Sequence, residues 1–345
     1  MIHFVETPST TILANLIARQ DLGEEQMRWI IEEMVNGRCD SSLAAAFLMG
    51  LRMKGETAAE IAVAADVLRK HMVRWQPGQD SVLDTCGTGG DSSGTFNIST
   101  ATALVVAACG VPVVKHGNRS ASSRSGSADV LTALGVVAQG SPEHARRCLE
   151  QAGIAFCFAP LFHPALKHVA ALRRQLAIPT IFNWLGPLAN PAGASHQLLG
   201  VGRVDMLDRM AIALSRLATT RSLVIHSEDG LDEVSLGATT LVREVIGSEI
   251  RSWQWTPEAF GLPRCTIADW RAVDAQDSAR IIEEILAGRD GPCTWVVQAN
   301  AAAGLWLTGR VADLAQGVKL AAAAVSSGKA RLVLDNLRRL CNDDS

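Results

Sequence analysis

The sequence predicts an α/β protein with a small all-helical N-terminal domain and a larger α/β domain that has a central, mainly parallel sheet. A helical pattern of apolar residues is continuous over residues 10–71, and beyond a break at residues 75–78 (Trp-Gln-Pro-Gly) short apolar runs alternate with helices. Such alternation is typical of a parallel sheet covered by helices. The length of 345 residues also exceeds the size at which one core usually stops growing, so two domains are expected.

The N-terminal helices carry local signals of their own. Thr57 and Glu60 form a capping box that opens a helix through Leu68. Residues 42–51 are dense in alanine and leucine, and the small alanine side chains let helices approach closely, which suits a compact helical domain or a subunit interface. One apolar helix face is formed by Met27, Ile30, Ile31 and Met34.

The larger domain is predicted to begin at residue 77. The segment 164–190 fits neither pattern, because a basic helical run is followed by several prolines, and it is assigned to a crossing back into the helical domain. The helical domain is therefore expected to comprise residues 1–76 with 164–190, and the α/β domain residues 77–163 with 191–345. Strands are expected at residues 81–84, 111–115, 222–225 and 294–297, and helices at residues 98–108, 128–134, 206–217 and 279–286.

Composition excludes several classes of protein. Hydrophobic residues make up 48% of the chain and charged residues 19%, which is the balance of a globular protein rather than a disordered one. The formal net charge is only -3, with both signs mixed along the chain, so no nucleic-acid or membrane partner is expected and any phosphate must be bound locally. The N-terminal residues lack a secretory pattern and no run reaches bilayer-spanning length, which makes the cytoplasm the expected location.

The eight cysteines are scattered through the chain. They show neither a C-x-x-C pair nor the regular spacing that marks a zinc site or a disulfide framework. We interpret them as small buried hydrophobic residues in a reducing compartment.

A glycine-rich turn at residues 87–91 (Gly-Thr-Gly-Gly-Asp) leaves the first predicted strand and runs into a helix start rich in hydroxyl side chains. Glycines let the backbone approach a ligand, and the unpaired N–H groups at the start of a helix attract anions. The lysine of a P-loop is absent, and the G-x-G-x-x-G spacing of dinucleotide folds is only partly met. Taken alone, the segment fits a phosphate cradle and an ordinary tight turn with an N-cap equally well.

Two further polar loops are expected beside this turn. Residues 115–119 (Lys-His-Gly-Asn-Arg) follow a predicted strand directly, and the carboxyl ends of parallel strands are where α/β sheets bind ligands. Residues 122–129 form a hydroxyl-rich loop at the start of the next helix. The loop is interpreted as an N-cap with Asp129 in the first turn, as a phosphate contact, or as both at once. Two such loops on neighbouring strands could hold a ligand with two phosphate groups.

An acidic loop follows the strand predicted at residues 222–225. Residues 227–233 (Ser-Glu-Asp-Gly-Leu-Asp-Glu) crowd four carboxylates together, and a solvated loop is one interpretation. Beside a phosphate site the carboxylates would instead suit Mg²⁺, a hard cation that combines few protein oxygens with water and substrate phosphates. His163, Arg173 and Arg174 carry little weight on pattern alone, since such residues are usually solvated or part of the core.

Taken together, these segments resemble the anthranilate phosphoribosyltransferases, the tryptophan-biosynthesis enzymes that join anthranilate to phosphoribosyl pyrophosphate (PRPP). The resemblance extends over nearly the whole chain, with the motifs in the family's order. It implies a cleft between a helical and an α/β domain, a homodimer through the helical domain, and Mg²⁺. The matching motifs lie at residues 87–91, 95–100, 115–119, 125–129, 182–183, 185–188, 190–191 and 229–233.

The resemblance assigns roles to individual residues. No covalent catalyst or general base is implied, because the aryl amine of anthranilate is already neutral. For PRPP it implies Gly87, Gly90, Asp91, Thr95, Asn97, Ser99, Thr100, Lys115, Ser122, Ser123 and Ser127. For anthranilate it implies Gly87, Asn118, His163, Gly186 and Arg173, the last as the cation for the carboxylate. For Mg²⁺ it implies Ser99, Asp232 and Glu233.

Three positions depart from the family pattern: Ser92 stands where glycine is frequent, Trp184 replaces a leucine, and Ala171 stands where proline is common. Ser92 could stiffen the phosphate loop, and the other two lie on the acceptor side.

The residues leave two alternative functions open. A pyrimidine nucleoside phosphorylase would bind inorganic phosphate without needing a metal pair, and a non-catalytic relative would bind nucleic acid through a basic groove, which the slightly acidic chain does not favour.

Overall fold

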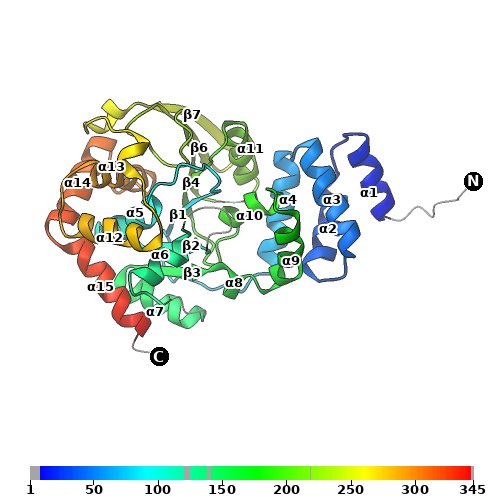
Figure 1. The fold of residues 1–345 in the computed structure, drawn as a ribbon, viewed down its shortest axis with the longest axis horizontal. Helices are drawn as coiled ribbons and strands as arrows, with labels where there is room; N and C mark the ends of the chain where they lie inside the picture. The colour runs from blue at the N-terminus through cyan, green and yellow to red at the C-terminus, as the bar shows by residue number, and fades with distance from the viewer. Residues whose placement is uncertain (1–7, 120–124, 138–140, 218, 343–345) are drawn as a thin grey trace, which may run out of the picture.

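The computed structural model describes residues 8–119, 125–137, 141–217 and 219–342. At the N-terminus a bundle of helices projects from one side of the molecule (Figure 1). Its members are α1 (Pro8–Ile17), α2 (Glu24–Val35), α3 (Ser41–Lys54) and α4 (Ala58–Lys70).

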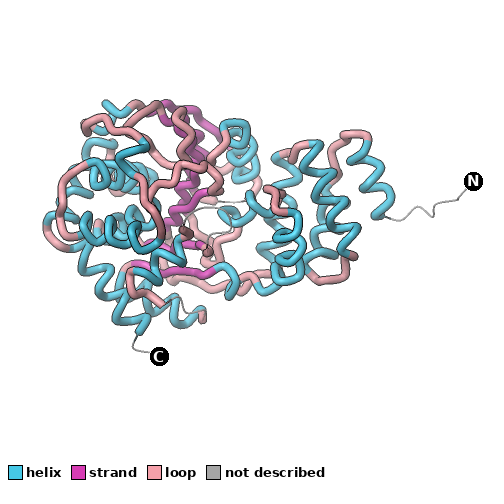
Figure 2. The backbone as a smooth tube through the Cα atoms, in the orientation of Figure 1, coloured by secondary structure: helices cyan, strands magenta, loops and turns pink. Residues whose placement is uncertain are grey.

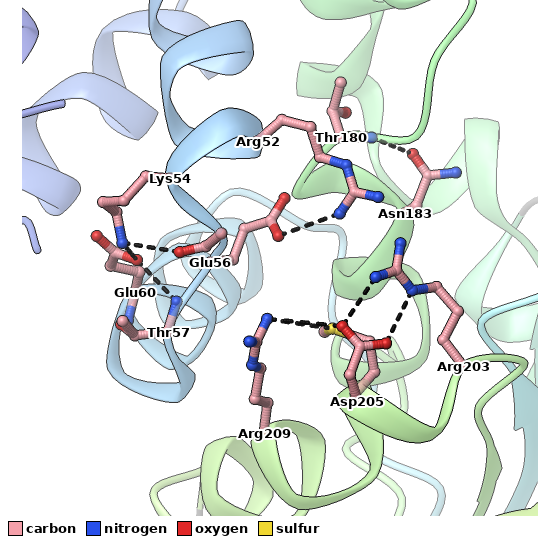
Figure 3. A network of polar contacts seen from close by, with 12 residues as sticks. Arg52, Lys54, Glu56, Thr57, Glu60, Thr180, Asn183, Arg203, Asp205 and Arg209 are labelled. Carbon is pink, nitrogen blue, oxygen red and sulfur yellow. Dashed lines mark hydrogen bonds and ion pairs between the residues drawn. The ribbon is translucent and has the colours of Figure 1, made fainter. Parts of the chain in front are cut away.

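The start of α4 is the predicted capping box. Thr57 Oγ1 accepts a hydrogen bond from the Glu60 backbone N–H at 3.2 Å, and the Glu60 carboxylate accepts one from the Thr57 N–H at 2.8 Å. Glu60 also pairs with Lys54 Nζ at 2.9 Å, so one buried carboxylate fixes the turn between α3 and α4 (Figure 3). The capping box prediction is therefore confirmed.

A seven-stranded sheet with the order β3-β2-β1-β4-β5-β6-β7 forms the centre of the larger part. Neighbours from β3 to β5 pair in parallel, and β6 and β7 are antiparallel, which confirms the predicted mainly parallel sheet. Figure 2 shows the strands as one band through the molecule with helices on both sides. The strands are β1 (Leu83–Gly87), β2 (Val113–Gly117), β3 (Ile154–Phe158), β4 (His196–Gly200), β5 (Arg221–Ser227), β6 (Thr240–Ile246) and β7 (Glu249–Trp255).

Helices cover both faces of the sheet. On the face away from the N-terminal bundle, α5 packs against α13, α14 and α15, and on the other face α11 lies between the sheet and α4 (Figure 1). In the connecting segment, α9 packs against α2 and α3, and α10 packs against α4. The helices are α5 (Ile98–Ala108), α6 (Ser127–Ala133), α7 (Pro142–Ala152), α8 (Ala159–Phe162), α9 (Lys167–Leu176), α10 (Phe182–Leu188), α11 (Val204–Ser215), α12 (Ala275–Leu286), α13 (Pro292–Leu307), α14 (Leu314–Ser326) and α15 (Lys329–Asn342), with short 3-10 turns at Pro164–Leu166, Pro257–Phe260 and Ile267–Trp270.

The hydrophobic core continues from the N-terminal bundle into the sheet. Ile61 of α4 belongs to the same buried cluster as Met210 of α11, Leu199 of β4 and Val224 of β5. Burial of large apolar side chains is the main stabilising term in folding, so the bundle is held to this face of the sheet by packing. The network in Figure 3 lies in the same region, where Arg52 and Glu56 come near Arg209 and its neighbours on α11.

The strand predicted at residues 294–297 is wrong. These residues lie inside α13, which is buried on nearly all sides. A helix without a polar face has no amphipathic period, so its valines and threonine resemble a strand locally. The sheet ends at β7 instead, and β3, β4, β6 and β7 are strands that the apolar pattern does not predict. No helix in the described part of the chain is both long and apolar enough to cross a membrane.

Candidate active site

The polar loops meet at one edge of the sheet. β1 lies between β2 and β4 and is parallel to both, and β4 is parallel to β5, so the carboxyl ends of these strands lie along the same edge. Gly87 at the end of β1 pairs directly with Gly200 at the end of β4. The glycine-rich turn, the Lys115 loop and the acidic loop therefore border one space, the usual place for a ligand in this architecture.

The glycine-rich turn follows β1 and depends on positive φ angles. Gly89 and Gly90 have φ of +65° and +79°, and Ser92 has φ of +57°. This left-handed region favours glycine, so Ser92 holds a glycine conformation at a cost of about 1 kcal/mol. Asp91 fixes the turn by accepting hydrogen bonds from the Ser93 N–H at 3.2 Å and the Ser93 hydroxyl at 2.7 Å.

Asn97 links three segments at the start of α5. Its Oδ1 accepts a hydrogen bond from Ser125 Oγ at 2.8 Å and one from Ser278 Oγ at 3.0 Å, while its backbone N–H donates to Ser278 Oγ at 2.9 Å. The glycine-rich turn is thereby tied to the hydroxyl-rich loop before α6 and to α12. Ser278 has no motif around it in the sequence, and only its hydrogen bonds to Asn97 reveal it.

Lys115, in β2, is a buried cation at this edge. Its Nζ donates to Ser99 Oγ at 3.1 Å and to the Thr85 carbonyl oxygen. Burial lowers the pKa of Lys115, and the nearby carboxylates of Asp84 and Glu233 act in the opposite direction. The lysine thus places positive charge beside a hydroxyl at the first turn of a helix.

A cluster of carboxylates faces this lysine. Burial and the charge of Asp91 raise the pKa of Asp232 to about 7, and burial and the charge of Asp232 raise the pKa of Glu233 well above its usual value. Carboxylates raise one another's pKa in this way when too little positive charge lies near them to balance their negative charges. A hard divalent cation bound by oxygen atoms would supply that charge, so Asp232, Glu233 and the Ser99 hydroxyl are chemically suited to Mg²⁺.

Behind the loops, Asp84 and Asn190 form a buried pair that sequence reasoning missed. Asn190 Nδ2 donates to Asp84 Oδ2 at 2.8 Å and to the Val114 carbonyl oxygen at 2.8 Å, and Asp84 Oδ1 accepts from the His116 N–H at 3.2 Å. Burial raises the pKa of Asp84 to about 6. The pair joins β1, β2 and the segment after α10. The Asn-Pro motif at residues 190–191 is the signal that could have pointed to Asn190.

Two histidine rings lie side by side where the site approaches α10. The ring centres of His116 and His163 are 4.9 Å apart, and the ring planes are tilted by 46° to each other. His116 Nδ1 lies 3.0 Å from the Gly186 carbonyl oxygen and His163 Nε2 lies 3.0 Å from the Ala189 carbonyl oxygen, so each ring donates there and keeps its other nitrogen as an acceptor. Burial lowers the pKa of His116 to about 3 and that of His163 to about 4, so both rings are neutral.

The remaining acceptor-side residues are less closely assembled. The Arg173 guanidinium lies 5.7 Å from the centre of the Phe182 ring, at the start of the helix that carries Gly186. Asn118 Oδ1 accepts a hydrogen bond from the Arg119 N–H at 2.8 Å. The structure therefore brings His163 and Gly186 together through His116, a member of the motif at residues 115–119 for which no role of its own was predicted.

Three of the other predicted donor residues lie in the described part of the chain. Thr95 Oγ1 is 3.3 Å from Ser93 Oγ, and Ser127 begins α6 directly over Gly117. Thr100, on α5, is only 1% exposed, so its side chain is covered by the surrounding protein in this structure. Ser122 and Ser123 lie outside the described residues.

Comparison with known proteins identifies the family. A model of the glycosyl transferase family's a/b domain matches residues 79–331, and the helical bundle domain of the same family matches residues 10–72. The anthranilate phosphoribosyltransferase of Methanosphaerula palustris is 49% identical over 327 residues, covering 94% of this chain and 96% of that protein. The enzyme of the same name from Geotalea uraniireducens is 44% identical over 345 residues, covering 96% of this chain and 99% of that protein.

The chain belongs to the anthranilate phosphoribosyltransferase family. Solved structures of family members have the same fold. The enzyme from Thermus thermophilus matches with a TM-score of 0.88 and 39% identity, covering 96% of this chain and 99% of that one. The Saccharomyces cerevisiae enzyme, in complex with PRPP and Mg, matches with a TM-score of 0.88 and 26% identity, covering 99% of each chain. The family and the fold class predicted from the motifs are confirmed, and these relatives support neither the nucleoside phosphorylase nor the nucleic-acid-binding alternative.

Proposed function

We propose that this protein transfers the phosphoribosyl group of PRPP to the amine of anthranilate and releases pyrophosphate. The observation that carries this proposal is the meeting of the Lys115–Ser99 pair with the carboxylates of Asp232 and Glu233 beside the glycine-rich turn. A cation, a helix start and a metal-binding carboxylate pair are what a diphosphate leaving group requires. Membership in the anthranilate phosphoribosyltransferase family supports the same reaction.

PRPP binds across the edge of the sheet in this proposal. The backbone N–H groups of the glycine-rich turn and the start of α5 hold phosphate oxygens, and Lys115 neutralises the leaving pyrophosphate. Asn97 keeps the turn and the hydroxyl-rich loop at a fixed separation. The donor set is Gly87, Gly90, Asp91, Thr95, Asn97, Ser99, Thr100, Lys115, Ser122, Ser123 and Ser127.

Ser99, Asp232 and Glu233 would hold Mg²⁺. When bound, Mg²⁺ supplies additional positive charge to the pyrophosphate oxygens. Asp232 and Glu233 are partly buried, and a counter-charge would let both ionise together at neutral pH. The Saccharomyces cerevisiae relative in complex with PRPP and Mg supports a metal of this kind in the family.

Anthranilate binds on the side of α10. Arg173 would pair with its carboxylate, and Gly87, Asn118, His163 and Gly186 would complete the acceptor site. The neutral rings of His116 and His163 offer nitrogen acceptors to amine hydrogens without a charge that would repel an arginine. Placement rather than proton abstraction is the task of these residues, because the aryl amine is already nucleophilic.

We propose that residues 1–76 with 164–190 form the helical domain, and residues 77–163 with 191–345 the α/β domain that binds PRPP. A homodimer through the helical domain is favoured by apolar side chains on α1 and α3, where Ile17 is 84% and Met53 is 70% exposed. Sedimentation velocity tests the dimer, and a single species of monomer mass would exclude it.

The cytoplasm is the proposed location, since all eight cysteines carry free thiols.

The reaction itself has a direct test. Purified protein with PRPP, anthranilate and Mg²⁺ is expected to consume the fluorescence of anthranilate and to release pyrophosphate in equal amount. Omitting PRPP or adding a chelator should stop both signals. A folded preparation that consumes no anthranilate, yet cleaves a pyrimidine nucleoside with inorganic phosphate in the presence of chelator, would overturn the proposal.

A further inference from the structure

A buried cluster of one imidazole and two thiols lies between α7 and α15, near the C-terminus (Figure 1). The Sγ atoms of Cys148 and Cys341 lie 3.3 Å and 3.5 Å from His144 Nε2. The three atoms all lie within 4.8 Å of one another, and the residues are 7%, 2% and 4% exposed for His144, Cys148 and Cys341. The cluster shares no residue with the site at the sheet edge.

We propose that His144, Cys148 and Cys341 form a binding site for a thiophilic metal ion of the Zn²⁺ class. Thiolate and imidazole are the ligands that Zn²⁺ prefers, and a tetrahedral ion with bonds of about 2.3 Å to sulfur and 2.0–2.1 Å to nitrogen separates the two donors by about 3.6 Å. The observed separations of 3.3 Å and 3.5 Å are close to that value. An ion therefore fits between the three atoms with small side-chain shifts.

The helices place these ligands without a loop. His144 and Cys148 are four residues apart on α7 and share one helix face, and Cys341 is on the last turn of α15, which packs against α7. Ligands on two packed helices give a site whose geometry is set before the ion binds. The ion would link the C-terminal helix to the body of the protein.

Protons must leave for the ion to enter. Arg147 Nη2 lies 3.0 Å from His144 Nδ1, so without the ion Nδ1 accepts and Nε2–H points toward the two sulfur atoms. On binding, the imidazole proton moves from Nε2 to Nδ1, Arg147 turns away, and both thiols lose their protons to solvent. The bound state has two thiolates, one neutral imidazole and one divalent ion, so the cluster itself becomes neutral.

A metal ion held by these three side chains has one further coordination position, which is either occupied by water or empty. Among the described residues the metal-ligating group contains these three side chains and no fourth. Zinc is known to bind three protein ligands while its fourth position stays open to water. Softer ions bind the same three ligands with a lower coordination number. Binding is thus expected to stabilise the fold and to leave the transferase site unchanged.

Co²⁺ provides a spectroscopic test with the full-length, reduced protein under anaerobic conditions. One equivalent per chain is expected to produce a thiolate-to-cobalt charge-transfer band in the near ultraviolet, and Zn²⁺ should bleach it. Cys341→Ser and Cys148→Ser should each lose most of the band. Cys109→Ser, a buried cysteine outside the cluster, is the matched control and should keep it.

Melting curves provide the second readout, because Zn²⁺ that binds only the native state should raise the wild-type melting temperature by a few degrees. Cys341→Ser should show no such shift while its metal-free melting curve stays cooperative. The proposal is overturned if the wild type gives no charge-transfer band, or if both serine variants retain the full band.

Discussion

A Cβ atom placed on Gly87 would lie 2.5 Å from the Asp232 Oδ2 atom. Gly87 ends β1 and Asp232 lies in the loop after β5, so glycine is the residue that lets the two loops approach. The requirement is one of space, since no real Cβ contact is so short.

We expect Gly87→Ala to push the Asp232 carboxylate out of position and to reduce kcat/KM by roughly 10² or more, because metal and diphosphate both depend on it. Steady-state fluorescence assays measure the loss. Gly23→Ala is the control, since a Cβ there meets nothing closer than 3.7 Å. Equal activity of the two variants would show that the contact between Gly87 and Asp232 has no functional weight.

Lys115→Met tests the buried cation. It removes the hydrogen bond to Ser99 Oγ and a positive charge that acts on the Glu233 carboxylate, so we expect kcat to fall by roughly 10² with the fold retained. Rates at saturating PRPP and Mg²⁺ measure the effect. Lys319→Met, on the exposed surface of α14, should match the wild type. A Lys115→Met enzyme with normal kcat but a higher KM for PRPP would assign the lysine to ground-state binding alone.

Arg173 and Arg174 form a matched pair for the acceptor. Arg173 is partly buried near Phe182, whereas its neighbour Arg174 is exposed. Arg173→Met should raise the KM for anthranilate by roughly 10-fold or more while leaving the KM for PRPP unchanged, because a charge-assisted bond to the carboxylate is lost. Arg174→Met should change neither constant. The same rise in the KM for anthranilate in both variants would indicate that the total positive charge of α9, rather than Arg173 itself, attracts the carboxylate.

Asp232 makes stability depend on pH. Its pKa is raised to about 7 in the fold from about 3.9 in the unfolded chain, so the native state holds a proton that the unfolded state has lost between these values. This contribution to stability is complete below about pH 4 and is lost as pH rises through about 7. In buffer without Mg²⁺ and PRPP, we expect Asp232→Asn to gain roughly 1 kcal/mol over the wild type between pH 5 and 8, after allowance for partial exposure.

Urea unfolding at several pH values measures this difference. Asp80→Asn, on an exposed loop, should run parallel to the wild type. A difference between Asp232→Asn and the wild type that does not change with pH would contradict the assigned cause.

The pair of Asn190 and Asp84 is expected to matter for folding. Asn190→Ala leaves a buried carboxylate oxygen and the Val114 carbonyl oxygen without their donor, and we expect a loss of roughly 2–4 kcal/mol in the free energy of unfolding. Combining it with Asp84→Asn should cost less than the sum of the two single changes, since both remove the same interaction. Strict additivity in denaturant titrations would refute the coupling.

Much of the fold could be predicted because its signals are local. The capping box of Thr57 and Glu60 spans four residues, and the polar motifs lie at the carboxyl ends of β1, β2 and β5. Strand ends on the same edge of a parallel sheet then bring those motifs together. The strand expected at residues 294–297 was wrong because α13 is buried on nearly all sides and so has no amphipathic pattern.

By itself the sequence determined β1, β2, β5 and α5, which carry the polar motifs, together with the glycine-rich turn and the family. These depend on residues close together in the chain, whose spacing fixes caps, turns and faces. Only the tertiary structure decided which distant groups meet. Asn190 reaches Asp84 across 106 positions, Ser278 reaches Asn97 across 181, and Cys341 reaches His144 across 197. Such pairs depend on how whole helices pack against the sheet. The pattern of residues that are close together in the sequence does not predict that packing.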